Sequence, residues 1–334
     1  MPCSNDIGFR RVNRVKYLNE FSEGDRVSGV YLCKKAATLT TKNGKEYMSL
    51  TLMDKTASVD AKIWEPNSEG IGDFGELDYI DVNGDVTIFN GAVQVNVRRL
   101  RRAEDGEYNP ADYLPMSPFD NDSMYTQLKN VIDTVKNPYL NKLLAGFFIE
   151  DVAFIDSFRK SSAAKTVHHA FVGGLMQHTL AVTRLCKFYT KAYPALDHDL
   201  LISAALLHDI GKVRELSRFP ENDYTDDGQL LGHIYIGAEM IAEYANRIES
   251  FPPKLLSELQ HCILAHHGEL EYGSPKTPEL IEALALNMAD NTDAKIETFS
   301  EAVAGRESGK WLGMNRPLGG NIRKTYEWTE EKNE

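Results

Sequence analysis

The chain has 334 residues, of which 26% are charged and 42% are hydrophobic, a balance typical of globular proteins and unlike that of disordered or fibrous chains. At roughly 150 residues per domain, it has room for about two domains. The 49 acidic residues outnumber the 37 basic ones and give a net charge of −12. This charge argues against bulk, non-specific adhesion to nucleic acid or anionic membranes, but it leaves room for a local basic groove.

The sequence shows no sign of a membrane or secreted protein. The longest apolar run, Leu200 to Leu207, is far shorter than the roughly 20 residues that span a bilayer, and no signal-peptide apolar region is found near the start. The four cysteines are scattered without a C-x-x-C pair, which predicts neither a disulfide framework nor a cysteine zinc site. We therefore expect a cytoplasmic protein that does not associate with membranes.

The first half of the chain has the pattern of β-strands. Between residues 26 and 102, short alternating runs are separated by the dipeptides Asn43-Gly44, Asn83-Gly84 and Asn90-Gly91, which are typical of turns. In three of these runs, apolar residues occupy every second position, so that they lie on one face of a strand. They are Met48, Leu50 and Leu52, then Val59, Ala61 and Ile63, and then Val93, Val95 and Val97. About five such strands in roughly 80 residues predict a small barrel of the OB type, whose outer surface commonly binds oligonucleotides.

Beyond the barrel, the sequence predicts a connector and then helices. Residues 106–122 contain Pro110, Pro115 and Pro118 among Gly, Asn and acidic residues, which is the composition of a linker. Helical periodicity follows over 125–135, 139–158, 174–189, 200–210, 233–248, 255–266 and 279–296. The predicted fold class is therefore multidomain, β plus α: an extension (1–16), the barrel (17–105), the connector, an all-α domain (123–300) and an unassigned tail (301–334).

Histidines and carboxylates in the helical half predict a metal site. Seven of the nine histidines lie between His178 and His267, at or beside the ends of predicted helices. His208 and Asp209 are adjacent where an apolar helix stops; alone, such a pair is more often a helix-terminal hydrogen bond than a pair of ligands. His178 follows two glycines, and Asp290 lies on an otherwise apolar helix, where a buried carboxylate needs a cation or hydrogen-bond donors. Together these residues favour the metal site.

The order His178, His208-Asp209, Asp290 resembles the HD superfamily of metal-dependent phosphohydrolases. His233 and His266-His267 stand where its two-metal members carry further histidines. Three further features narrow the resemblance to one family of this superfamily. They are the run Gly173-Gly174-Leu175-Met176-Gln177-His178-Thr179, the preceding pair His168-His169 and the barrel in front of the helices. Over about residues 17–300, the chain resembles the YhaM family of 3′–5′ exoribonucleases.

That resemblance implies a ligand set. His178, His208, Asp209 and Asp290 would hold one metal, and Asp209, His233 and His266 would hold the second, with Asp209 bridging. His267 remains the alternative to His266, because sequence does not distinguish adjacent histidines. The resemblance also implies a hydrolase that releases nucleotides from the 3′ end of single-stranded RNA, with DNA as an alternative substrate.

The ligand types and their neighbours indicate how the site would work. Imidazole and carboxylate without thiolate suit two divalent ions, with Mn²⁺ preferred and Fe²⁺, Mg²⁺ or Co²⁺ as alternatives to it. We expect Lys212 to place its ammonium beside the scissile phosphate. The sequence equally allows that Lys212 is a solvated lysine near a helix end. His169 is a catalytic candidate, as a phosphate donor or a partner of the ligands, or else it caps a helix or fills the core.

The barrel carries a candidate nucleic-acid face. Tyr47, Lys62 and Trp64 have outward parity and combine stacking surface with a cation, as single-strand binders do. A basic cluster at the end of the last predicted strand consists of Arg98, Arg99, Arg101 and Arg102. The alternative is that Trp64 covers the barrel end and that these arginines pair with Glu104 and Asp105.

Other functions are compatible with the same ligands. A nucleotide or cyclic-nucleotide phosphohydrolase would use the barrel for regulation or assembly, and only the barrel argues for a polynucleotide substrate. A non-catalytic single-strand binder is disfavoured because all ligand positions hold competent residues. A homo-oligomer is compatible with the sequence.

Overall fold

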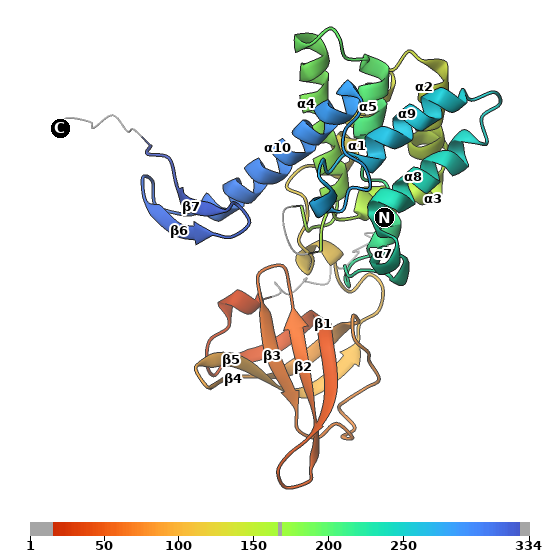
Figure 1. Ribbon diagram of the computed structural model, residues 1–334. Coiled ribbons are helices and arrows are strands. Elements are labelled where there is room, and N and C mark those ends of the chain that lie inside the picture. Colours follow the sequence, from red (N-terminus) through yellow and green to blue (C-terminus); the bar gives the residue numbers. More distant parts are fainter. Residues whose placement is uncertain (1–15, 166–168, 328–334) are drawn as a thin grey trace, which may run out of the picture. The chain divides into compact units, whose positions relative to one another are not determined.

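The computed structural model describes residues 16–165 and 169–327 (Figure 1), so that His168 and Trp328 lie outside the described part. The chain divides into two compact units, Met1–Pro115 and Met116–Glu334. The division falls within residues 106–122, where the composition predicts a connector.

The first unit is a closed five-stranded barrel. Its strands are β1 (Arg26–Thr40), β2 (Glu46–Met53), β3 (Ser58–Ile63), β4 (Tyr79–Phe89) and β5 (Ala92–Arg102). The order β1-β2-β3-β5-β4 closes because the first half of the long β1 pairs with β4 and its second half pairs with β2. The predicted apolar parity fills the interior, where Leu50, Leu52 and Ala61 are at most 1% exposed. The prediction of an OB-type barrel is confirmed.

One predicted turn is wrong. Asn43-Gly44 and Asn90-Gly91 do connect antiparallel strands, but Asn83-Gly84 lies inside β4, where the register with β5 shifts in a β-bulge. A Cβ atom at position 84 would lie 2.3 Å from the carbonyl oxygen of Asn96. This glycine therefore permits the close approach of two strands rather than a reversal of the chain.

Short segments at both ends of the barrel complete the first unit. A 3₁₀ turn, η1 (Leu18–Glu20), buries Leu18 against the barrel core, and the backbone N–H of Leu18 donates to Asp54 over 2.6 Å. A second 3₁₀ turn, η2 (Pro110–Asp112), leads to the buried Tyr113 and Leu114. The first unit thus includes residues beyond position 105, the predicted end of the barrel domain.

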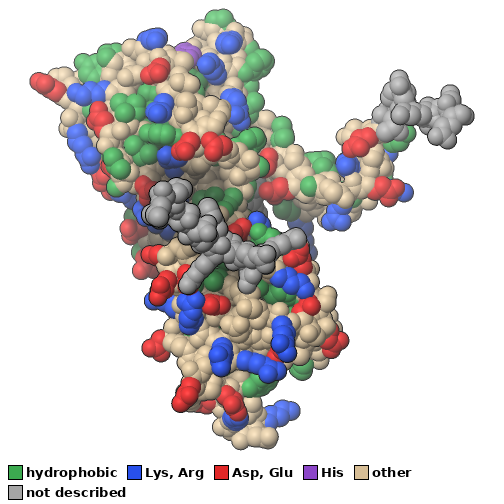
Figure 2. Space-filling view, turned by 180° about the vertical axis from the view of Figure 1, so that it is seen from behind, with side chains coloured by type: hydrophobic (Ala, Val, Ile, Leu, Met, Phe, Trp, Pro, Cys, Tyr) green, Lys and Arg blue, Asp and Glu red, His purple; other side chains and the backbone are tan. Residues whose placement is uncertain are grey.

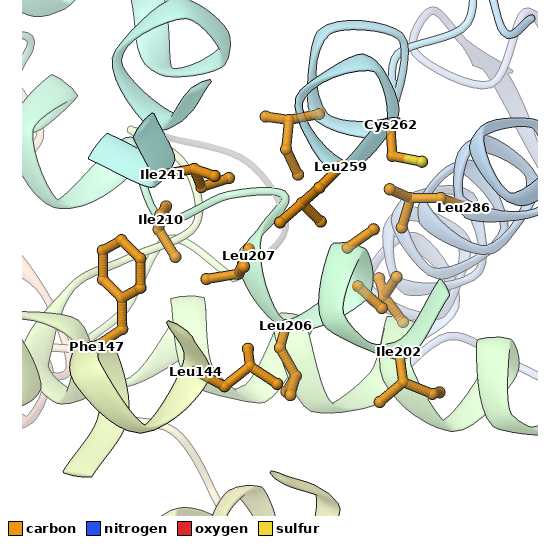
Figure 3. Close-up of a cluster of buried hydrophobic side chains, with 14 of the residues drawn as sticks. Leu144, Phe147, Ile202, Leu206, Leu207, Ile210, Ile241, Leu259, Cys262 and Leu286 are labelled. Atoms are coloured by element: carbon orange, nitrogen blue, oxygen red, sulfur yellow. The ribbon is translucent and has the colours of Figure 1, made fainter. Parts of the chain in front are cut away.

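The second unit is helical. Its helices are α1 (Asn121–Ile132), α2 (Pro138–Ala145), α3 (Val152–Lys160), α4 (Gly174–Ala192), α5 (His198–Leu207), α6 (Lys212–Glu215), α7 (Asp226–Leu230), α8 (Gly232–Ala245), α9 (Pro253–Leu264) and α10 (Ile281–Val303). A π-helical turn, η3 (Gly146–Glu150), and a 3₁₀ turn, η4 (Leu270–Tyr272), lie between them. Helix α5 is at the centre of the core, and Figure 3 shows Ile202, Leu206 and Leu207 among side chains from several other helices.

Two segments differ from the predicted helices. Residues 139–158 do not form one helix, because η3 and an extended Asp151 interrupt it, and the Asp151 side chain then accepts a hydrogen bond from Phe154 N–H to begin α3. The unassigned tail holds an antiparallel hairpin of β6 (Trp311–Asn315) and β7 (Gly320–Arg323). Among the helices of the described residues, none has the length and apolar character to cross a bilayer.

Candidate functional site

The predicted ligands converge from the ends of several helices. His178 lies in the second turn of α4, His208 ends α5 with Asp209 behind it, and His233 begins α8. His266 follows α9, and Asp290 lies on α10. Four of these six side chains are buried, and His233 and Asp290 are only 12% and 16% exposed, so that the core of the helical unit holds an unusual number of polar groups.

Two glycines permit this convergence. A Cβ atom at Gly174 would lie 2.0 Å from the carbonyl oxygen of His169, and one at Gly211 would lie 2.0 Å from that of His233. The first contact holds the His169 loop against the start of α4, and the second brings α8 onto the turn that follows Asp209. Glycine is required at both positions because any side chain would separate the ligand-bearing segments.

The first ligand group surrounds one small space. The Nε2 atom of His178 lies 3.1 Å from that of His208, 3.1 Å from Asp290 Oδ1 and 3.5 Å from Asp209 Oδ2. His208 Nε2 lies 3.4 Å from the same Asp209 oxygen. Ligands about 2.1 Å from one ion are roughly 3 Å apart when they subtend a right angle, so that these spacings suit a single divalent ion.

The second ligand group faces the other oxygen of Asp209. Asp209 Oδ1 lies 3.5 Å from His233 Nε2 and 3.7 Å from His266 Nε2. His267 joins this group, since His233, His266 and His267 each offer a ligand atom within 4.8 Å of the others. Asp209 therefore has one oxygen toward each group, which is the arrangement expected of a bridging carboxylate.

Each buried histidine is held so that its Nε2 atom faces the centre. The Nδ1 atom of His208 lies 2.9 Å from Ala205 O, and that of His266 lies 2.6 Å from Ile263 O. His178 Nδ1 lies 2.7 Å from Asp293 Oδ2, and His233 Nδ1 lies 2.8 Å from a Glu215 oxygen. Such outer partners fix the ring orientation and leave Nε2 as the ligand atom.

Sequence reasoning missed the two carboxylates among these partners. Asp293 contacts both His178 and His169, and Glu215 accepts from the backbone N–H of His233 as well as facing its ring. One signal was present, because Asp293 lies three residues beyond Asp290 and therefore on the same face of a helix. Glu215, only six residues after Asp209, reaches His233 through the tertiary approach at Gly211, which no local pattern indicates.

The electrostatics of the cluster favour a bound cation. Burial opposes ionisation of Asp209, but Lys212, His208 and His233 outweigh it and hold the pKa of this carboxyl well below its usual range. Burial also opposes charge on His178, yet its hydrogen bonds to Asp290 and Asp293 raise its pKa to about 9. Buried carboxylates thus draw positive charge into the site.

The unpartnered atoms fit divalent metal ions. Within the described residues, both oxygens of Asp209 and the Nε2 atoms of His233 and His266 are buried without a hydrogen-bond partner. Lys212 Nζ lies 2.8 Å from Asp209 Oδ2 as an ion pair, but not in hydrogen-bond geometry. Buried polar atoms left in this state are costly unless a ligand satisfies them. Burial together with His267 and His208 lowers the pKa of His266 and keeps this imidazole neutral, as a metal ligand must be.

The remaining catalytic candidates lie beside the cluster. Lys212 is only 15% exposed and paired with Asp209, so that the interpretation as a solvated lysine is wrong. His169 is buried with a φ of 59°, and its Nε2 lies 3.1 Å from Asp293 Oδ2. His169 therefore approaches the first ligand group through the carboxylate that orients His178.

On the barrel, the structure brings two of the three face residues together. Tyr47 and Trp64 stack with ring centroids 5.1 Å apart, and Trp64 is 47% exposed, with its Nε1–H donating to Asn96 over 3.0 Å. Lys62 is different, because it donates to Ser49 Oγ over 2.6 Å and its side chain is 16% exposed. The aromatic pair is available to a base, whereas the lysine is largely covered.

Three of the four predicted arginines on β5 already have acidic partners. Arg98 pairs with Asp85, Arg102 with Asp78, and Arg101 with both Asp81 and Glu107. These partners differ from Glu104 and Asp105, the two that sequence suggested. Arg99 is exposed and has no ion pair among the residues that the structure describes. Figure 2 shows basic and acidic side chains side by side on the lower, barrel part of the surface.

Comparison with known proteins shows the family to which the chain belongs. The HD domain family matches residues 175–295, the segment from the start of α4 to the middle of α10. The 3′-5′ exoribonuclease YhaM of Shouchella clausii (strain KSM-K16) is 35% identical over 290 residues, which cover 86% of this chain and 89% of that relative. The chain belongs to the YhaM family. Its HD domain lies within the helical unit and carries the histidine and aspartate cluster, as the sequence resemblance predicts.

Two solved structures are similar to about a quarter of the chain. A replication protein A heterotrimer bound to single-stranded DNA matches 26% of this chain and 64% of its own, at 17% identity and a TM-score of 0.21. The second OB-fold domain of replication protein A from Methanococcus maripaludis matches 27% of this chain and 96% of its own, at 18% identity and a TM-score of 0.21.

Proposed function

We propose that the protein is a metal-dependent 3′–5′ exonuclease that hydrolyses single-stranded RNA with two divalent ions. The observation that carries the proposal is the position of Asp209, whose two oxygens face two separate groups of histidine Nε2 atoms at 3.4–3.7 Å. A shared carboxylate between two ligand groups is the arrangement that a two-metal hydrolase needs. Membership of the YhaM family supports a phosphodiester substrate and the 3′ polarity.

The residues suit divalent ions, of which we propose Mn²⁺. His178, His208, Asp209 and Asp290 would hold the first ion, and Asp209, His233 and His266 the second, with His267 as a further ligand or a substrate contact. Two such ions, when bound, acidify a water molecule and neutralise phosphate oxygens. Mixed imidazole and carboxylate ligands without thiolate favour Mn²⁺ or Fe²⁺ over the zinc of structural sites.

The chain itself would supply the other parts of the chemistry. Lys212 keeps an ammonium beside Asp209, because the ion pair outweighs burial and raises the pKa of this lysine. A fixed cation there would stabilise the charge that a scissile phosphate gains in the transition state. Asp293 and Glu215 would hold the rings of His178 and His233, and His169 would hold Asp293 in turn.

The barrel would bind the single strand that the helical unit hydrolyses. The Tyr47–Trp64 pair offers an exposed stacking surface, and Arg99 offers an exposed cation not engaged in an ion pair within the described residues. Stacking and a backbone cation together are the usual features of single-strand binding. A cytoplasmic location and a homo-oligomer stay predictions of the sequence.

End-labelled single strands test the function. With Mn²⁺, a 5′-labelled RNA should shorten stepwise, and the same RNA with a blocked 3′ end should resist hydrolysis. Asp209→Ala should abolish the reaction, whereas Glu258→Gln, an exposed carboxylate on α9, should not change it. Stepwise loss from the 5′ end would overturn the polarity. Rapid hydrolysis of cyclic dinucleotides or nucleoside triphosphates in place of RNA would overturn the substrate class.

A further inference from the structure

The hairpin near the C-terminal end of the described chain is basic in a protein that is strongly acidic. Residues 306–327 contain five basic side chains, namely Arg306, Lys310, Arg316, Arg323 and Lys324, and two acidic ones, Glu307 and Glu327. The segment thus has a charge of +3, from five positive and two negative groups, against −12 for the whole chain. A local excess of positive charge on such a chain favours an anionic partner.

The two faces of this hairpin differ. On one face, Ile322 is 6% exposed and Leu318 lies nearby, and both line a groove of about 560 Å³ with Ile296 and Phe299 of α10. The opposite face is open, since Trp311, which is paired across the strands with Arg323, is 64% exposed. The apolar face therefore borders a groove that it shares with α10 and leaves the Trp311 face available.

Aromatic and cationic groups are clustered on the open face. The Arg323 guanidinium lies 5.9 Å from the centre of the Trp311 ring. Tyr326 is 66% exposed and, like Arg323, lies close to Gly309, where an added Cβ would be 3.4 Å from the tyrosine ring and 3.6 Å from the guanidinium. Stacking surfaces beside a cation are what successive bases of a single strand bind.

Helix α10 connects this cluster to the candidate active site. Asp290 and Asp293 lie near its middle, and Phe299, which lines the hairpin groove, follows Asp290 by nine residues, or about 14 Å along the helix axis. We propose that the β6–β7 hairpin is a second single-strand binding element, which stacks bases of the RNA on Trp311 and Tyr326 and contacts its phosphates through Arg306 and Arg316. This inference rests on the proposed function for its substrate, and it assigns a role to a tail that sequence left unassigned.

Equilibrium binding to RNA tests the hairpin apart from catalysis. The full-length protein is titrated with a long labelled single-stranded RNA in excess chelator, so that no hydrolysis occurs. Trp311→Ala should weaken binding roughly 5- to 150-fold, since stacking on one base is lost, and Trp311→Tyr should restore most of it. Arg306→Ala with Arg316→Ala should lower the slope of log K against log salt by about 0.7 for each lost phosphate contact.

Matched variants on α4 are the controls. Phe188 is 63% exposed, and Arg184 and Lys191 are exposed on the same helix, so that Phe188→Ala and Arg184→Ala with Lys191→Ala remove similar groups elsewhere. Neither should change binding or salt dependence. Removing residues 328–334, which contain three glutamates and one lysine, should not weaken binding either.

The outcomes separate this inference from the proposed function. If the wild type hydrolyses and binds RNA and the hairpin variants match it, the hairpin inference is wrong and the exonuclease stands. If Trp311→Ala changes the molar mass in light scattering but leaves RNA affinity unchanged, the face contacts protein and the inference is also overturned. If RNA binds in the hairpin-dependent way but is not hydrolysed with Mn²⁺, the binding element stands and the exonuclease fails.

Discussion

The metal centre and the barrel surface both gather charged side chains, but they neutralise them differently. On β5, Arg98, Arg101 and Arg102 lie at the surface, and each has an aspartate or glutamate beside it. In the centre, Asp209 and Asp290 are surrounded by imidazoles, and several ligand atoms lack a hydrogen-bond partner among the described residues. The difference indicates where a ligand would bind: the three paired arginines are balanced by side chains of the barrel, whereas the centre holds buried ligand atoms that an added cation would satisfy.

Of the changes that test this comparison, removal of the shared Asp209 carboxylate should have the largest effect on metal binding and RNA hydrolysis. Asp209→Ala should lose both ions and reduce RNA hydrolysis at least about 1,000-fold, since metal ions contribute several kcal/mol to such reactions. His233→Ala should lose mainly the second ion, because His178, His208 and Asp290 remain. Metal content by mass spectrometry, together with the hydrolysis rate, measures both. An Asp209→Ala protein with two ions per chain and near-normal turnover would contradict the bridging role.

Metal should also stabilise the helical unit. At an ion concentration about 100 times the dissociation constant, binding adds roughly 2.7 kcal/mol to the free energy of unfolding. For a unit of this size, that corresponds to a rise of about 5–10 °C in the melting temperature. The measurement is the helical circular dichroism signal on heating, with Mn²⁺ and with chelator. Asp209→Ala is the control and should show no shift, and an equal shift in both proteins would place the ions elsewhere.

On the barrel, the exposed aromatic pair should matter more than any single arginine. Trp64→Ala should weaken single-strand binding by roughly 1–3 kcal/mol, because a stacking surface is lost. The salt dependence should stay nearly constant, since an indole releases no counterions. Affinity across a salt series checks this, with the metal content as the control that must not change. If the Trp64→Ala protein binds with wild-type affinity, the single strand does not bind at this face of the barrel.

The smallest expected effect separates the paired arginines from the unpaired one. Arg99→Ala should lower the slope of log K against log salt by about 0.7, as expected for one lost phosphate contact. Arg101→Ala should change the slope less, because Asp81 and Glu107 already neutralise this guanidinium. Equal slopes for the two variants would show that RNA displaces the acidic partners and that the arginines act as one cluster.

Much of the fold could be predicted because local patterns agree with it. Alternation on β2 and β3 reports the buried face directly, and the apolar run of α5 marks the centre of the helical unit. Asn83-Gly84 shows the limit of such patterns, since a glycine that looks like a turn serves a contact with Asn96 on another strand. Periodicity over 139–158 likewise does not reveal that Asp151 is extended and begins a new helix.

In the candidate site, too, some residues could be predicted from the sequence and others could not. His178, His208, Asp209 and Asp290 are distinctive as residue types at helix ends, and the resemblance to a family orders them. The partners that orient them are less visible, because Glu215 and Asp293 are common surface residue types whose role depends on tertiary packing. The pairing of Arg98, Arg101 and Arg102 could not be assigned either, since cross-strand register decides which acid lies opposite which base.

The contact at Gly211 limits how far this centre can vary. The backbone of α8 comes so near that a single methyl group at position 211 would overlap the His233 carbonyl. Any larger residue would push His233 outward from Asp209 Oδ1, now 3.5 Å away, while His178 and His208 lie on elements that this contact does not involve. A substitution at this one position is therefore expected to disturb the second ligand group while the first group keeps its arrangement.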